Sequence, residues 1–345
     1  MDPMLQGRVF LNENKVNNFK FPFFTETSGT IHMVPLNKIC GTLFLVAVSL
    51  CVFGQATGQT DSTNPQTPAL PDTIPFVLTP HNNLIVKAVL NGQDTVDLMF
   101  HTAAGDLTLI KSATARLTTL NFNGQDTVNS WGGDNASRYS TGNALQIRDL
   151  KWAGVSIWEN ENSGPLSDGK FGPDLFTGKA IEIDFDHNRL VIHSDMPDIK
   201  GDYEKLDLVF QNGMMFVEGL STIGDTRYPN RFLIHSGYAG AVLFDDAFAD
   251  RNKLNDNLKI TDQKELKDSY GNVLKTQKAI MPAFSIGATT LTDIPVGFFA
   301  GSIKRQKISV LGGEVIKRFN IVIDPRRENI YLKVNHLMST PYSEG

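Results

Sequence analysis

Two short segments with similar residues decide the fold: Leu98-Met-Phe-His101-Thr-Ala-Ala-Gly105 and, later, Phe232-Leu-Ile-His235-Ser-Gly-Tyr-Ala-Gly240. In each segment a run of apolar residues reaches a histidine, which is followed by a hydroxyl residue and then by small residues. An apolar run that ends in small and polar residues is typical of a β-strand that leads into a tight loop. The two segments therefore predict the same strand and loop at two places in the chain.

A second pair of segments follows the first pair in the same order and at nearly the same spacing. Phe171-Gly172 and Leu311-Gly312 each start a short segment that leads into an alternating, hairpin-like stretch. Self-similarity at a constant offset indicates a repeated architecture. We therefore expect two lobes, an N-terminal β lobe of residues 75–198 and a C-terminal β lobe of residues 202–336.

Within each lobe the local patterns are mostly those of strands. Residues 83–90 and 96–100 are apolar runs on either side of Asn91-Gly92, a dipeptide that strongly favours a β-hairpin turn. The helices that we expect are short, at residues 173–177 and 313–318. Short strands that recur about every 8–12 residues are typical of sandwiches and barrels. The sequence therefore predicts an all-β protein.

This combination of segments resembles the pepsin/retropepsin superfamily of aspartic peptidases, specifically the secreted bilobal form found in bacteria. The resemblance implies a bilobal double barrel with an interlobe cleft, to which each lobe contributes one of the two loops. It also implies that hydroxyl residues hold the loops together and that the apolar-Gly segments brace them. A β-hairpin flap is expected at Trp131-Gly132-Gly133. The residues that match the supporting positions of the family are Thr102, Ser236, Ala103, Gly237, Gly172 and Gly312.

The chain departs from the family at the two positions that carry its catalytic aspartates, which are His101 and His235 here. Two carboxylates about 3 Å apart share one proton, so that one acts as a base and the other as an acid. A pair of imidazoles is neutral or cationic and lacks that negative charge. Ala103 also replaces a glycine of the family pattern. We therefore interpret the protein as a catalytically degenerate aspartic-peptidase-like protein, a pseudoprotease, which binds an extended peptide or a similar ligand in the interlobe cleft.

Four alternatives stay open. The first is an active peptidase in which a His101/His235 dyad supplies both acid and base, because imidazoles titrate near neutral pH. The second is a metal- or ligand-binding role for the pair, although a zinc site requires three or four protein ligands. The third is a purely structural module, and the fourth is that Asp106 or Asp245, just beyond the loops, serves in place of a histidine. No cofactor is predicted, and finding histidine in both lobes favours a selected role for the pair.

Composition and spacing exclude other classes of site. The formal net charge is −5, and no cluster of Lys and Arg is present to form a nucleic-acid surface. Asp184, Asp186 and Asn188 are spaced as at the start of a calcium-binding loop, but Arg189 stands where such a loop needs glycine. A hairpin turn is the better interpretation of that segment.

The N-terminal region has the layout of a secretory signal peptide. An apolar stretch at residues 39–53 is preceded by Lys38 and followed by small residues. Such a stretch, about 15 residues long, is short for a membrane span, which needs about 20. We predict a signal peptide at residues 33–56 that starts at Met33, with residues 1–32 as a start-site overextension or a disordered arm. A cytoplasmic arm before a membrane anchor is the alternative.

Removal of the signal peptide would leave a mature chain without cysteine, because Cys40 and Cys51 both lie within it. The following segment, residues 57–74, is rich in Thr, Gln, Asp, Asn and Pro and is predicted to be a flexible linker. We therefore expect a secreted or periplasmic protein with an extended peptide or a similar ligand as its partner. After removal of the signal peptide we expect no nucleic-acid or membrane partner, and the sequence leaves the oligomeric state open.

Overall fold

A computed structural model of the protein describes residues 71–130, 133–267, 273–299 and 306–343. All of these residues belong to one compact unit. The predicted N-terminal arm, the signal peptide and most of the linker lie outside the described residues.

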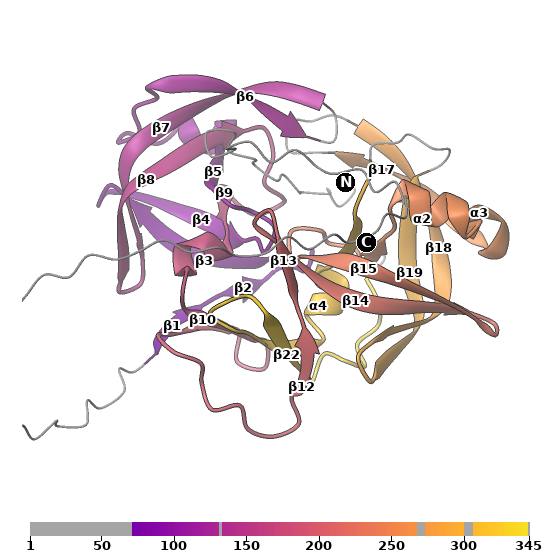
Figure 1. Ribbon diagram of the computed structural model, residues 1–345. Helices are drawn as coiled ribbons and strands as arrows, with labels where there is room; N and C mark the ends of the chain where they lie inside the picture. Colours follow the sequence, from indigo (N-terminus) through magenta and orange to yellow (C-terminus); the bar gives the residue numbers. More distant parts are fainter. Residues whose placement is uncertain (1–70, 131–132, 268–272, 300–305, 344–345) are drawn as a thin grey trace, which may run out of the picture. The chain divides into compact units, whose positions relative to one another are not determined.

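The first lobe is a β-barrel (Figure 1). Its strands are hydrogen-bonded in the order β2-β3-β4-β9-β5-β8-β7-β6, and an additional pairing between β3 and β7 closes the barrel. The turn between β3 and β4 contains Asn91 and Gly92, both with positive φ, as predicted for a hairpin. The strands are β2 (Val77–Leu78), β3 (Leu84–Leu90), β4 (Asp94–Phe100), β5 (Leu107–Ile110), β6 (Gly124–Ser130), β7 (Gly133–Ile147), β8 (Leu150–Asn160) and β9 (Gly169–Phe171).

The second lobe is a barrel with the same strand order. Its order is β13-β14-β15-β20-β16-β19-β18-β17, and a pairing between β14 and β18 closes it. Each barrel includes two parallel pairs of strands, β4 with β9 and β5 with β8 in the first barrel, and β15 with β20 and β16 with β19 in the second. The strands are β13 (Val209–Gln211), β14 (Met214–Ile223), β15 (Thr226–His235), β16 (Val242–Leu243), β17 (Ile260–Lys267), β18 (Val273–Ile286), β19 (Thr289–Phe299) and β20 (Ser309–Gly312).

A third sheet joins the two lobes. It contains the hairpin that ends each lobe, and the two hairpins meet where Ile181 of β10 pairs with Ile323 of β21. The first strand, β1, begins at Asp72, inside the segment predicted to be a linker, because it pairs with β11 at the edge of this sheet. The strands, in their order across the sheet, are β1 (Asp72–Pro75), β11 (Arg189–His193), β10 (Ala180–Asp184), β21 (Phe319–Ile323), β22 (Asn329–Val334) and β12 (Glu204–Asp207).

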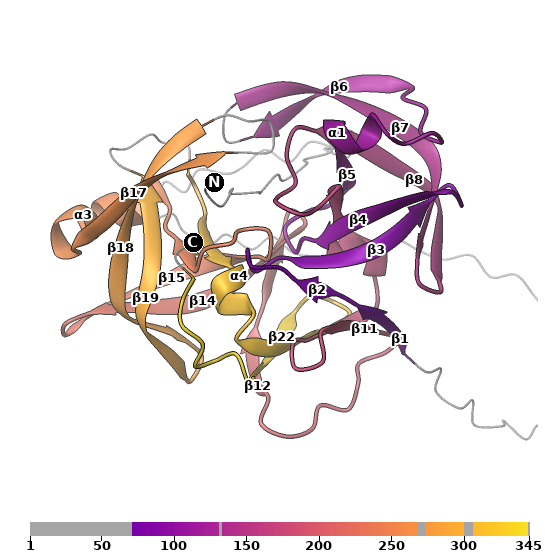
Figure 2. The same ribbon diagram turned by 180° about the vertical axis from the view of Figure 1, so that it is seen from behind.

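The helices of the described residues are short. The two predicted ones are present as a 3₁₀ turn, η2 (Pro173–Phe176), and as α4 (Gly313–Ile316), and each directly follows the glycine of an apolar-Gly segment. Figure 2 shows α4 beside the start of the first barrel, near β2. In the described part of the chain no helix combines the length and the apolar character needed to cross a membrane. The other helices are α1 (Lys111–Thr114), α2 (Asp246–Arg251) and α3 (Leu254–Asn257).

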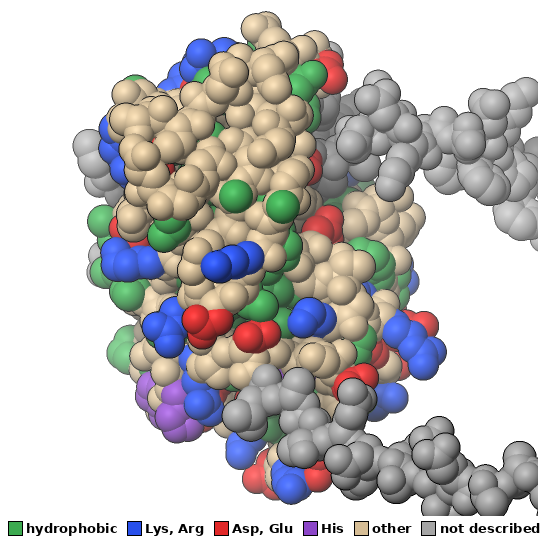
Figure 3. Space-filling view, turned by 90° about the vertical axis from the view of Figure 1, so that its left-hand side faces the viewer, with side chains coloured by type: hydrophobic (Ala, Val, Ile, Leu, Met, Phe, Trp, Pro, Cys, Tyr) green, Lys and Arg blue, Asp and Glu red, His purple; other side chains and the backbone are tan. Residues whose placement is uncertain are grey.

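One hydrophobic core runs through both barrels and the joining sheet. Phe100 and Phe171 lie 5.4 Å apart between ring centroids in the first barrel, and Phe232 and Phe284 lie 5.1 Å apart in the second. Full burial of such a side chain stabilises the fold by about 1.5–3 kcal/mol. On the face shown in Figure 3 the hydrophobic side chains form small groups among charges of both signs. The prediction of an all-β protein with two lobes is confirmed.

Candidate functional site

The first histidine of the predicted pair directly follows strand β4. Phe100 and Phe171 are partners in the parallel ladder of β4 and β9, and the backbone N–H of His101 donates to the carbonyl of Phe171 at 2.9 Å. The chain then turns, because the N–H of Ala104 donates back to the carbonyl of His101 at 3.0 Å. The side chain of His101 is fully buried.

The second histidine is held in the same way in the other lobe. His235 is the last residue of β15, where it pairs with Gly312 of β20 in a parallel ladder. The chain turns at once, since the N–H of Tyr238 donates to the carbonyl of His235 at 3.0 Å. The side chain of His235 is 1% exposed. The two loops are therefore built alike, each on a parallel pair of strands.

Reciprocal hydrogen bonds join the two loops through Thr102 and Ser236. The Thr102 hydroxyl donates to the carbonyl of Ile234 at 2.7 Å, and the Ser236 hydroxyl donates to the carbonyl of Phe100 at 2.8 Å. Each hydroxyl oxygen also accepts from the backbone N–H of the other residue, both at 3.0 Å. Both side chains are fully buried, so loss of either hydroxyl would leave buried polar groups without a partner. These four bonds fix the position of one loop against the other.

The structure brings the two imidazole rings into contact. The ring centroids of His101 and His235 lie 4.5 Å apart, and the ring planes make an angle of 61°. Nδ1 of His101 accepts a hydrogen bond from the N–H of Ala103 at 3.2 Å. A backbone N–H can only donate, so Nδ1 carries no proton in this arrangement and the ring is the neutral tautomer with its proton on Nε2.

The environment of His235 opposes its protonation. Burial, and then the positive charge of Lys170, lower the pKa of this imidazole from its ordinary value of 6.5 to about 3. Neither ring nitrogen of His235 has a hydrogen-bond partner among the described residues. The ring is therefore neutral at physiological pH, with a buried donor and a buried acceptor that a ligand could satisfy.

Two glycines allow the strands of each lobe to approach the loops closely. A Cβ atom at Gly172 would overlap with the carbonyl oxygen of Ala104, and one at Gly312 would overlap with that of Gly240. These positions therefore require glycine, which is a physical reason for the two apolar-Gly segments.

The small residues that follow the two hydroxyls in the loops are both buried. Ala103 packs against Met214 and Leu233 of the second lobe. Gly237 is buried in the other loop. The first loop therefore adds apolar packing between the lobes to the hydrogen bonds of Thr102 and Ser236.

Comparison with known proteins supports this fold. The chain matches no protein-family model and no curated protein sequence. It is similar to the crystal structure of an aspartic proteinase from Irpex lacteus, with a TM-score of 0.53 and 11% sequence identity. The match covers 79% of this chain and 100% of that chain. The fold is that of a pepsin-like aspartic proteinase. At this sequence identity the likeness shows the fold and does not extend to the activity.

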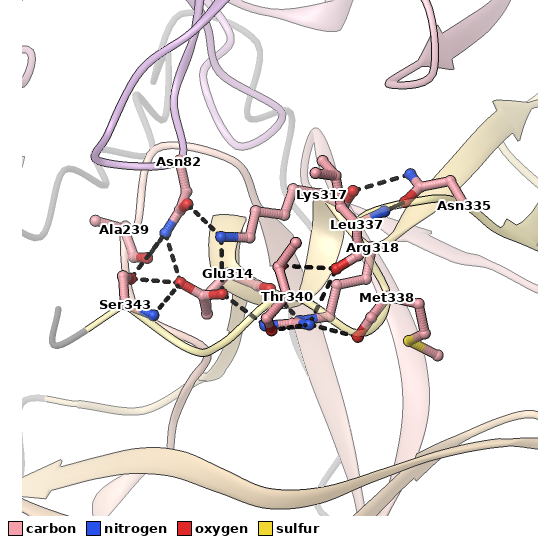
Figure 4. A network of polar contacts seen from close by, with 10 residues as sticks. All are labelled: Asn82, Ala239, Glu314, Lys317, Arg318, Asn335, Leu337, Met338, Thr340 and Ser343. Atoms are coloured by element: carbon pink, nitrogen blue, oxygen red, sulfur yellow. Dashed lines mark hydrogen bonds and ion pairs between the residues drawn. The ribbon is translucent and has the colours of Figure 1, made fainter.

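The loop of the second lobe is also held by the turn that precedes β3 in the first lobe. The side-chain amide of Asn83 donates to the carbonyl of Ser236 at 3.0 Å, and that of Asn82 donates to the carbonyl of Ala239 at 2.7 Å. The amide of Asn82 also donates to the carboxylate of Glu314 at 3.0 Å (Figure 4). These contacts are distant in sequence, and no local pattern predicted them.

Glu314 is the centre of a buried network that ties the C-terminal tail to the base of α4 (Figure 4). Its carboxylate pairs with Arg318 at 2.8 Å and Lys317 at 2.9 Å, and both the hydroxyl and the N–H of Ser343 donate to it. Burial opposes the charged form of Glu314, but the bonds from Ser343 and Lys317 hold its pKa below the usual value. Arg318 also donates to the carbonyls of three residues of the tail, Leu337, Met338 and Thr340.

The predicted flap lies at the end of the hairpin of β6 and β7. Ser130 pairs with Gly133, the first residue of β7, while Trp131 and Gly132 lie outside the described residues. The second barrel has a matching hairpin of β17 and β18, in which Lys267 pairs with Val273. The hairpin is therefore present, and its role as a flap stays a prediction.

The alternative acidic residues have other contacts. Asp245 is the N-cap of α2, and its carboxylate stabilises the start of this helix by accepting from the N–H of Phe248 at 2.8 Å. Asp106 lies between the first loop and β5 and is half-buried. Asp184, from the calcium-like spacing, is paired with His187 and Arg189 across a hairpin turn. Among the residues that the structure describes, no group of three His, Cys, Asp or Glu side chains is placed to hold a metal ion.

Sequence reasoning did not single out Lys170, which is fully buried beside the site. A signal for it was present, because Gly169-Lys170-Phe171-Gly172 corresponds to Ser309-Val310-Leu311-Gly312 in the second lobe. A lysine at a position where the other lobe has valine departs from the apolar pattern of both strands. That departure is what marks Lys170 for attention.

Proposed function

We propose that this protein is a catalytically degenerate aspartic-proteinase-like protein that binds an extended peptide or a similar ligand between its lobes without cleaving it. The observation that carries the proposal is the contact between the rings of His101 and His235 at the junction of the two loops. The hydroxyls of Thr102 and Ser236 hold this junction together. The parts that build the site are therefore present, with imidazoles at its centre.

The chemistry of the pair argues against efficient hydrolysis. Acid–base catalysis works best when the catalytic groups have pKa values near the working pH. The pKa of His235 is lowered to about 3, so at neutral pH this ring is a neutral imidazole, which is too weak an acid to protonate a leaving group. Nδ1 of His101 already accepts the N–H of Ala103. Two neutral rings also lack the negative charge with which a carboxylate pair activates water.

Binding does not depend on that charge. An extended peptide can be recognised through backbone hydrogen bonds to strands, with side-chain pockets adding specificity. The hairpins β6–β7 and β17–β18 are the long two-stranded elements of the two barrels that could supply such contacts. Binding would therefore survive the loss of the acid pair.

A peptide library tests this proposal. Purified protein is incubated with the library between about pH 3 and pH 8, bound peptides are recovered, and products are sought by mass spectrometry. We expect saturable binding with no cleavage. His101→Ala and His235→Ala are compared with His187→Ala, which alters a mostly exposed turn histidine.

The outcomes separate the alternatives. Cleavage by the wild type and His187→Ala that is lost in both His101→Ala and His235→Ala would overturn the proposal and identify a working histidine dyad. Absence of both binding and cleavage would favour a structural module. Binding that is reduced in the two site variants and unchanged in His187→Ala would place the ligand at the pair.

We also propose that the protein acts outside the cytoplasm, on the basis of the signal-like residues 33–56. Cellular fractionation followed by N-terminal sequencing tests this. A mature chain that begins near residue 57 in the extracellular or periplasmic fraction is expected. A full-length chain in the cytoplasmic fraction would contradict it.

A further inference from the structure

The loop that carries His235 is held from two sides through its backbone carbonyls. On one side, the first N–H groups of α4 donate to the carbonyls of Tyr238 and Gly240, at 2.7 and 3.3 Å. On the other side, the side-chain amide of Asn82 donates from the first lobe to the carbonyl of Ala239 at 2.7 Å. A shift of α4 or of the turn that contains Asn82 would therefore be passed directly to the loop of the second histidine.

Asn82 also binds α4 itself, so the two supports of the loop form one unit (Figure 4). Its side-chain amide donates to the carboxylate of Glu314 at 3.0 Å, and its side-chain carbonyl accepts from Lys317 at 2.9 Å. The φ of Asn82 is 60°, a left-handed conformation that asparagine adopts more readily than most residues. A Cβ atom at Gly313, the first residue of α4, would lie 2.5 Å from the backbone carbonyl oxygen of Asn82. The turn of the first lobe therefore fits closely against the start of α4.

The C-terminal tail, residues 335–343, is bound to this unit. The hydroxyl and the N–H of Ser343 both donate to the same carboxylate oxygen of Glu314, and the amide nitrogen of Asn82 lies 3.3 Å from the hydroxyl oxygen of Ser343. Earlier in the tail, the guanidinium group of Arg318 donates to the carbonyls of three tail residues. The tail is thus fastened along the base of α4, and Ser343 reaches the asparagine that holds the loop.

The first lobe has the matching helical turn without such a network. In that lobe η2 follows Gly172 as α4 follows Gly312, and Asp174 takes the place of Glu314. Asp174 is exposed, whereas Glu314 is 1% exposed. The fold therefore does not require a buried acidic side chain at this position, and burying one is costly even when it is paired with basic groups. The asymmetry between the lobes points to a role in fixing geometry and not only in stability.

We propose that the C-terminal tail is a positioning element of the histidine site: by holding Glu314 and Asn82 it fixes the loop of His235, and its release lets this loop shift against His101. Without Ser343 the carboxylate of Glu314 loses two donors, and the turn of Asn82 loses a fixed neighbour. The contact between the two rings, whose centroids lie 4.5 Å apart, then becomes looser. Ligand affinity falls as well, because only a fraction of the molecules keeps the binding geometry. This last step rests on the proposed function, whereas the effect on the rings does not.

Truncation tests the tail with a matched control. The complete chain is compared with a chain that ends at Thr340 and with one that ends at Ser343. The chain that ends at Thr340 loses Ser343 but keeps the three carbonyls that bind Arg318, whereas the chain that ends at Ser343 keeps both sets of contacts. Ser343→Ala and Ser343→Thr test the hydroxyl alone, since threonine retains it. The imidazole NMR signals of His101 and His235 are the main readout, because rings in contact shift each other's signals.

We expect the imidazole signals to shift in the chain that ends at Thr340 and, by a smaller amount, in Ser343→Ala. Ser343→Thr and the chain that ends at Ser343 should give the signals of the wild type. For a peptide selected from the library, the affinity of the chain that ends at Thr340 should fall by at least about fivefold, the lower end of the usual coupling between linked sites. In an Asn82→Gly background, where glycine accepts the left-handed conformation, the same truncation should cause no further shift, because the link through Asn82 is already lost.

The outcomes separate positioning from simple stabilisation. A tail that only stabilises the fold would lower the urea midpoint of the chain that ends at Thr340 and leave its imidazole signals and its peptide affinity unchanged; that result would overturn the inference and leave the proposed function standing. If the imidazole signals shift on truncation but no peptide binds to any of the chains, the inference stands and the proposed function is wrong. Should the shorter chain fail to fold, Ser343→Ala with Ser343→Thr as its control decides the question by the same signals.

Discussion

The buried, neutral His235 predicts a specific loss of stability in acid. The pKa of this ring is about 3 in the folded protein, whereas an unfolded histidine titrates near 6.5. Below pH 6.5 the unfolded chain therefore binds a proton that the folded protein does not bind. The free energy of unfolding falls as the pH drops from about 6.5 to about 3, and it is unaffected by this group above that range.

The magnitude follows from the same two values. Each pH unit in this window costs about 1.4 kcal/mol, so His235 alone removes about 2 kcal/mol between pH 7 and pH 5 and about 5 kcal/mol over the whole window. The charge that acts on this ring, that of Lys170, does not reverse the sign because it is positive.

Urea unfolding of the wild type and of His235→Asn at several pH values between 5 and 8 measures this contribution. The altered packing of the variant gives a constant offset, so the difference in slope isolates the titration. His187→Asn, which alters a mostly exposed histidine of a turn, is measured alongside as the control. Parallel curves for the wild type and His235→Asn would refute the reasoning that His235 is buried without a compensating anion.

Four other substitutions test how the loops and the C-terminal tail are held. Thr102→Val and Ser236→Ala should each lower the free energy of unfolding by about 1–3 kcal/mol, as measured by urea unfolding. The loss in the double variant should be smaller than the sum of the two single losses, because the two hydroxyls share hydrogen bonds. Gly172→Ala should lower the free energy of unfolding several times more than a Gly→Ala change at an exposed site, because the added Cβ would overlap with a loop carbonyl. A urea midpoint equal to that of the wild type would contradict this. Arg318→Met should cost up to about 3–5 kcal/mol, because it removes one of the two basic side chains that pair with the buried Glu314. It should also expose the C-terminal tail to limited proteolysis, and an unchanged cleavage pattern would argue against the network.

Much of the fold could be predicted because its signals are local. The Asn91-Gly92 turn marks a hairpin by its own backbone requirements, and both glycines of the apolar-Gly segments stand where a side chain would overlap with a loop. Alternation of apolar residues predicted the strands, and the two similar sets of segments predicted two lobes. The start of the first strand was placed too late, since β1 is held by its pairing with β11 and not by its own sequence.

The candidate site was predictable in part. The residues that meet at the loop junction are those that the two similar segments share, so His101 and His235 could be paired before their contact was known. The contacts of Asn82 and Asn83 with the second loop could not be predicted, because they join residues far apart in the chain. Lys170 was overlooked because a single charge in a strand does not reveal which way its side chain points.

The most direct test of this account is a crystal structure of the protein at neutral pH with a peptide selected from the library. The account predicts an intact peptide across the loop junction, in contact with the rings of His101 and His235. A cleaved peptide at the pair, or an intact one bound elsewhere with the two rings unchanged, would contradict it.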